Sequence, residues 1–195
     1  MTRRIFIFDP PDRFVAGAVG MPGRRTFYLQ ARAGDRIISV SLEKVQVAVL
    51  AERLDRLLDE LERRGLVEAT TESAEAVSGP PPLDEPLNEA FRAGTLTLGW
   101  DPEDERILIE ARELRPEDEG EAEEAEEAEE AVEWRDDDPT GPDVLRVRIS
   151  PPAARAFVAG AAAVVAAGRP PCPLCGAPLD PTGHLCPRRN GQRLN

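Results

Sequence analysis

Short apolar and alternating runs at the start of the chain predict β-strands. The four runs are residues 3–8, 14–19, 25–31 and 36–40. Prolines and glycines separate them, and neither residue type readily continues a sheet ladder. The last two runs flank Ala33-Gly34-Asp35, a sequence typical of a hairpin turn. We therefore expect the first forty residues to form strands joined by turns.

The hydrophobic period changes after this region. Large apolar side chains recur every three or four residues from Val45 to Leu61, which is the spacing of one face of a helix. Ser41 is the expected cap at the start of this helix, because a serine oxygen can accept a hydrogen bond from a first-turn amide. Gly65 is the expected cap at its end.

The second half of the chain repeats this order of patterns. Residues 95–100 and 106–111 predict a hairpin, and residues 144–149 predict a further strand. A second helix should begin at Ser150, with a proline at its first position where the missing amide costs least, and end at Gly168.

Two four-residue segments indicate an internal duplication. Phe14-Val15-Ala16-Gly17 resembles Phe91-Arg92-Ala93-Gly94, and each is followed by strands and a helix. Duplication and chance both remain open, since two short copies are weak support. The predicted fold class is α+β, with two β-β-β-α units packed as one layered domain and a C-terminal zinc knuckle.

The predicted boundaries follow changes in composition. They are a first unit at 1–68, a linker at 69–89, a second unit at 90–168 that contains a disordered acidic insert at 117–140, and a zinc knuckle with a basic tail at 169–195.

The acidic insert dominates the net charge of -13. Residues 117–138 hold 14 acidic residues and one base, and the remainder of the chain is balanced. Such blocks of like charge are usually solvated, so we interpret the tract as a self-repelling surface linker. The alternative is a decoy polyanion that competes with nucleic acid for the basic C-terminal end.

The three cysteines and the single histidine of the protein lie between residues 172 and 186. Cys172 and Cys175 have the Cys-x-x-Cys spacing of a zinc knuckle, and His184 and Cys186 supply an imidazole and a third thiolate. Four such ligands fill a tetrahedral site, which predicts structural rather than catalytic Zn²⁺. The alternatives are a redox pair, cysteines buried as apolar residues, and a two-ligand site shared with another chain.

Arginines follow the predicted metal site directly. Arg188, Arg189 and Arg193 could be presented by the knuckle to phosphate or to a partner, together with the strand face of Arg146 and Arg148. The alternative is a solvated basic tail, because no aromatic residue lies near it to stack on bases.

The chain offers little for catalysis or for membrane insertion. No apolar run is long enough to span a bilayer, and no signal peptide is recognisable at the N-terminus. Clustered cysteines without a disulfide framework fit a reducing compartment, so we expect a cytoplasmic protein. An enzyme needs a nucleophile, a base or an open metal position, and zinc would use the best candidate side chains.

Several segments resemble one known family: residues 8–20, 26–31, 168–176 and 179–191. It is a family of uncharacterised actinobacterial proteins, domain of unknown function 3090. The resemblance covers almost the whole chain apart from the acidic insert. It implies residence in the cytoplasm, no known catalytic residue, and a suggested link to a ParA-type chromosome-partitioning ATPase.

These observations predict a zinc-binding, non-catalytic adaptor for protein–protein interaction, with the ParA-type ATPase as a candidate partner. The first alternative is a nucleic-acid-binding regulator that uses the C-terminal arginines. The second is an enzyme with a pocket that the sequence does not reveal. No membrane partner is expected.

Overall fold

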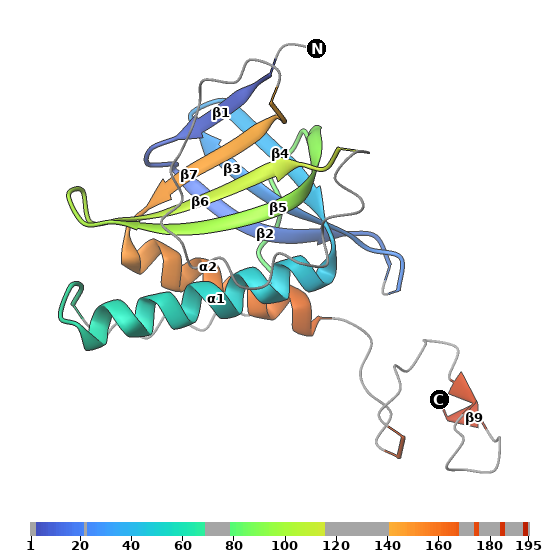
Figure 1. The fold of residues 1–195 in the computed structure, drawn as a ribbon. Helices are drawn as coiled ribbons and strands as arrows, with labels where there is room; N and C mark the ends of the chain where they lie inside the picture. The colour runs from blue at the N-terminus through green and yellow to red at the C-terminus, as the bar shows by residue number, and fades with distance from the viewer. Residues whose placement is uncertain are drawn as a thin grey trace.

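Seven strands of the described chain form one sheet, and its two long helices pack side by side on one face of that sheet (Figure 1). The computed structural model describes residues 3–21, 23–68, 79–115, 141–167, 174–175, 184–185 and 193–194. The sheet strands are β1 (Ile5–Phe8), β2 (Arg13–Val19), β3 (Thr26–Ala33), β4 (Arg36–Leu42), β5 (Glu89–Asp101), β6 (Arg106–Glu113) and β7 (Val144–Ile149). The helices are α1 (Lys44–Arg63) and α2 (Pro151–Ala166).

The strand order across the sheet is β1-β7-β6-β5-β4-β3-β2. Strands β2, β3 and β4 are antiparallel neighbours, and so are β5, β6 and β7. The two sets are joined by parallel pairing of β4 with β5, and β1 adds in parallel to β7. The predicted mixture of helices and strands in a layered fold is confirmed, as is each predicted strand.

The core lies between the sheet and the helices. In register across three strands, Ala16, Leu29 and Val40 are all buried. Helix α1 packs its own buried row against the sheet: Val47, Leu50, Ala51, Leu54, Leu58 and Leu61. Each large aliphatic side chain removed from water contributes about 1.5–3 kcal/mol, so this apolar row is what holds α1 to the sheet.

Aromatic stacking fixes α2 beneath β2. The rings of Phe14 and Phe157 stack with centroids 4.7 Å apart. Because side chains alternate along a strand, the residues next to Phe14 and Ala16 belong to the other side of the sheet, which we call the outer face. Gln30 and Ser39, paired across β3 and β4, lie on this face.

The helix ends confirm one predicted cap and correct another. Ser150 accepts a hydrogen bond from the Ala153 amide at 3.4 Å and caps α2 as predicted. The prediction that Ser41 caps α1 is wrong, because β4 stays paired with β3 up to Leu42 and the cap is Glu43. Ser41 instead donates a hydrogen bond to Glu89 Oε1 at 2.8 Å.

Glycine ends α1 as the sequence indicates. Gly65 follows the cap residue Arg64 with a φ of 67°, a left-handed conformation that costs glycine least. Helix α2 is capped at Ala167, and Gly168, its predicted end, lies outside the described residues. Neither described helix is both long and apolar enough to cross a membrane.

The acidic insert is placed between two neighbouring strands. Strand β6 ends at Glu113 and β7 begins at Val144, and the Glu113 amide donates to the Asp143 carbonyl at 2.8 Å. The insert at 117–140 lies outside the described residues. The sheet holds the residues on either side of the insert close together, so the insert connects β6 to β7 without interrupting either strand.

Candidate functional site

Residues 79–88, which we call the strap, lead into β5 and belong to the predicted linker at 69–89. A Cβ placed on Gly17 of β2 would lie 2.5 Å from the Leu83 side chain. A Cβ on Gly160 of α2 would lie 3.3 Å from the Pro81 ring. Gly17 belongs to the outer face, whereas α2 packs on the opposite face. The strap therefore passes around the edge of the sheet at β2.

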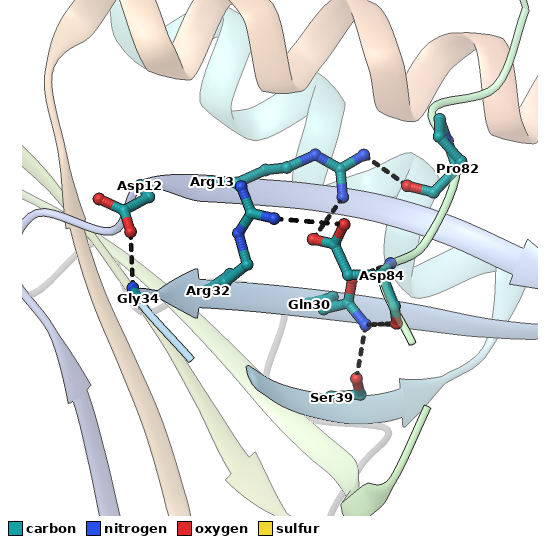
Figure 2. A network of polar contacts seen from close by, with 8 residues as sticks. All are labelled: Asp12, Arg13, Gln30, Arg32, Gly34, Ser39, Pro82 and Asp84. Carbon is teal, nitrogen blue, oxygen red and sulfur yellow. Dashed lines mark hydrogen bonds and ion pairs between the residues drawn. The ribbon is translucent and has the colours of Figure 1, made fainter. Parts of the chain in front are cut away.

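A buried glutamine binds the strap on the outer face (Figure 2). Gln30 is 1% exposed, and its Nε2 donates to the Asp84 carbonyl at 3.0 Å. The Asp84 amide donates in return to Gln30 Oε1 at 2.7 Å. Gln30 Nε2 also donates to Ser39 Oγ at 3.0 Å. The amide side chain is thus satisfied although it is buried, as buried polar groups generally are.

Two arginines from neighbouring strands hold the Asp84 carboxylate (Figure 2). Arg13 Nη1 donates to Asp84 Oδ2 at 2.9 Å, and Arg32 Nη1 lies 3.6 Å from Asp84 Oδ1. Arg13 also donates to the carbonyl of Pro82. Arg13 and Arg32 are paired across β2 and β3, so the sheet register places both guanidinium groups beside one carboxylate.

An open cavity of about 320 Å³ lies beside the strap. Its lining is mostly apolar: Ala18, Val19, Gly20, Pro80, Pro81, Pro82, Leu83, Leu87 and Val164, with Arg25, Asp84 and Glu85. Arg25 Nη1 donates to the Ala167 carbonyl at 2.7 Å and so satisfies one of the last carbonyls of α2. The cavity therefore lies between the strap, the end of β2 and the C-terminus of α2.

A second polar cluster lies on the outer face of β6 and β7. Glu110 is fully buried and accepts hydrogen bonds from Arg112 Nε at 2.7 Å and from Arg146 Nε at 2.9 Å. Arg146 Nη2 makes a further bond to Glu110 at 2.8 Å. Register pairs Glu110 directly with Arg146, so the predicted arginine face of β7 is neutralised in part by a glutamate of β6.

Arg148, the other arginine of that predicted face, contacts three carboxylates. Its Nη1 lies 3.0 Å from Asp9, and its Nη2 contacts Asp101 and Asp104. Burial alone would lower the pKa of Arg148, but the hydrogen bonds and charges of these carboxylates outweigh it and raise the pKa. Hydrogen bonds from the amides of Asp104 and Glu103 lower the pKa of Asp101, and Arg148 lowers it further.

The outer face therefore presents matched ion pairs instead of an unpaired row of arginines. Its described part holds no histidine or cysteine. Ser39 Oγ accepts a hydrogen bond from the Gln30 amide, whereas Ser41 Oγ donates one to Glu89 Oε1 at 2.8 Å. The arrangement suits the binding of backbone and carboxylate groups.

Part of the predicted zinc site falls within the described residues. Leu174 and Cys175 form a turn, and His184 lies in β8 (His184–Leu185), which pairs antiparallel with β9 (Arg193–Leu194). Cys172, Cys186, Arg188 and Arg189 lie outside the described residues. Among the residues that are described, no three His, Cys, Asp or Glu side chains are grouped so as to hold a metal ion.

The sequence model of one family matches residues 6–186 of the chain, described as protein of unknown function (DUF3090). The chain belongs to this family. No curated protein and no solved structure matches the chain.

The DUF3090 match extends into the C-terminal segment that carries the predicted zinc ligands. The match includes the sheet, the strap, both helices and all four predicted zinc ligands. It ends before Arg188, Arg189 and Arg193. The four predicted ligands are thus part of the family domain, whereas the terminal arginines follow it.

Sequence reasoning missed the residues that bind the strap. Asp84 lies in a proline-rich segment that resembles a linker, and its partners Gln30 and Arg13 are 54 and 71 positions away. The signal that was available is a glutamine in the middle of an apolar strand, since a polar residue at such a position needs a partner.

Proposed function

We propose that this DUF3090 protein is a zinc-stabilised, non-catalytic binding protein that docks a protein partner in the cytoplasm. The observation that carries the proposal is the set Cys172, Cys175, His184 and Cys186, which lies within the family match and includes every cysteine and the only histidine of the chain. A reducing compartment would keep these thiols available for metal.

The local structure of the described residues supports a structural zinc site. A Cys-x-x-Cys pair binds one metal when the chain turns between the two thiolates, and Cys175 lies in a turn. His184 lies in a short two-stranded ladder, which would hold the backbone of the second pair of ligands in place. A Cys₃His set would fill all four tetrahedral positions and leave none for a reacting water.

The contacts of the strap on the described sheet support a binding role. On the outer face of the sheet, the strap is held by a side-chain amide and two guanidinium groups, which recognise backbone and carboxylate groups. A partner in the ParA-type partitioning ATPase class remains a proposal drawn from the family resemblance alone. Size-exclusion chromatography of the purified protein with such an ATPase would test it, and separate elution at micromolar concentrations would contradict it.

Metal analysis tests the zinc proposal. The purified chain should contain about one zinc per molecule, and Cys175→Ser and His184→Ala should each lose most of it. Arg188→Ala is the matched control, because it changes the same segment without removing a ligand. A folded wild-type chain without zinc and with all three thiols reactive toward a thiol reagent would contradict the proposal.

We further propose that the two halves of the domain are copies of one β-β-β-α unit. The order β2-β3-β4-α1 recurs as β5-β6-β7-α2. The two Phe-x-Ala-Gly segments lie in β2 and β5, the first strands of these halves. A Cβ on Gly17 would lie 2.5 Å from the Leu83 side chain, and one on Gly94 would lie 3.0 Å from the Leu114 Cα, so a leucine outside the strands packs closely on each glycine.

A further inference from the structure

The strap lies on the sheet without joining it. Pro80, Pro81 and Pro82 have no backbone N–H and cannot donate to a strand. Strand β2 is the last of the sheet, and no other strand of the described chain pairs with its outer edge. The strap is therefore attached through a few side chains, and no ladder of backbone bonds has to be broken to lift it.

One carboxylate neutralises both arginines beneath the strap. Within the described chain, Asp84 is the one acidic residue that pairs with Arg13 or Arg32. Asp12, although next to Arg13, accepts a hydrogen bond from the Gly34 amide at 2.6 Å. If Asp84 is lifted away, two guanidinium groups on adjacent strands lose their counter-ion. This part of the outer face then complements an acidic segment.

The contacts of the strap define a binding mode. Leu83 occupies the space over Gly17, the next residue places its carboxylate between Arg13 and Arg32, and Gln30 pairs with the backbone at that same residue. Extended peptides are recognised by the same three elements: a pocket for a side chain, a partner for a charge and hydrogen bonds to the backbone.

Space for a ligand continues beyond the strap. The open cavity runs from the strap to the end of β2 and Val164 of α2, and Arg25 lies in its wall. The strap covers part of this edge and leaves the groove beside it open. This open cavity is continuous with the space that the Leu83 side chain occupies.

We propose that the strap is a built-in competitor for a docking groove on β2 and β3, and that the groove binds an extended acidic segment of a protein partner. The segment carries an apolar residue followed directly by a carboxylate, as Leu83 and Asp84 do. This inference rests on the proposed binding function, for which it names the class of partner segment, and it does not depend on zinc.

A peptide with the sequence of residues 79–88 tests the groove, with fluorescence anisotropy on the full chain as the readout. Wild-type protein should bind it weakly, because its own strap occupies the site. Asp84→Ala should bind it at least about tenfold more tightly, since apparent affinity scales with the open fraction. A peptide with asparagine in place of the aspartate should bind neither protein.

The double variant Arg13→Ala/Arg32→Ala is the matched control for Asp84→Ala. It also releases Asp84, yet it should not bind the peptide, which separates recognition of the acid from mere opening of the strap. Asn88→Ala, an exposed change in the same strap, should behave as wild type. Leu83→Ala is a second way to open the groove if Asp84→Ala does not fold, as judged by thermal unfolding.

Two results would overturn the inference. One is a folded Asp84→Ala chain that binds the peptide no more tightly than wild type. The other is equal binding of the aspartate and asparagine peptides. The combination of Cys175→Ser with Asp84→Ala distinguishes the two proposals. Peptide binding that survives the loss of zinc supports the groove independently of the metal site. A folded Asp84→Ala chain that keeps its zinc but does not bind the peptide contradicts the groove and leaves the zinc proposal standing.

Discussion

Gln30 and Asp84 are joined by two opposed hydrogen bonds, from Gln30 Nε2 to the Asp84 carbonyl at 3.0 Å and from the Asp84 amide to Gln30 Oε1 at 2.7 Å. A side-chain amide thus pairs with a peptide group as two strands would pair. It attaches the strap at one residue and leaves the remainder of the proline-rich segment without a ladder. The attachment is specific because Gln30 is only 1% exposed, so that loss of Asp84 would leave a buried side-chain amide without its partner.

Gln30→Ala should lower the free energy of unfolding by about 1–3 kcal/mol, because it leaves the Asp84 amide and carbonyl without their partner. Urea denaturation measures this change. The variant should also be cut faster by a protease within the strap. Asn88→Ala, an exposed substitution in the strap, should change neither quantity. Equal protease sensitivity of Gln30→Ala and wild type would show that the strap is held elsewhere.

Gly17→Ala should destabilise the fold by about 1–3 kcal/mol through overpacking, since the added Cβ would lie 2.5 Å from Leu83. The effect should be smaller when Leu83 is already alanine. A double-mutant cycle measured by thermal unfolding would show this as a coupling between the two sites. Additive losses would mean that the methyl group clashes with something other than Leu83.

Regular periodicity and turn residues were enough to predict the strands and both helices. The apolar spacing from Val45 to Leu61 is a local signal, and α1 follows it. Strand β5 begins at Glu89, before the predicted residue 95, because Phe91 pairs with Val40 in a distant part of the chain. That pairing is a tertiary effect, and no local pattern reveals it.

The candidate site was harder to predict for the same reason. Its parts come from β2, β3, β4 and a proline-rich segment, and each part alone resembles an ordinary strand or linker. Glu110 shows the difficulty clearly, because it follows Ile107, Leu108 and Ile109 and became significant only when the register placed Arg146 opposite it. The zinc ligands, by contrast, were predicted from spacing alone, and they remain a prediction.

Glu110→Gln should cost about 3 kcal/mol of stability in urea denaturation. The Glu110 side chain is fully buried and that of Arg146 is 11% exposed, so removing the negative charge leaves a largely buried guanidinium with a weaker partner. Glu52→Gln is the matched control, because its ion pair with Arg56 is exposed and should contribute less than about 1 kcal/mol. Similar losses for the two variants would contradict the assignment of Glu110 as a buried charge partner.

Asp101 should make stability depend on pH in the acid range. Hydrogen bonds from the amides of Asp104 and Glu103, together with Arg148, lower its pKa in the folded state. A lowered folded pKa means that the carboxylate stabilises the protein above its unfolded pKa, about 4, and that this contribution is lost as pH falls through the folded pKa. Asp101→Asn should therefore melt below wild type at pH 7, with the difference shrinking toward pH 3. Glu103→Gln should follow wild type throughout, and a constant difference for Asp101→Asn would refute the carboxylate's role.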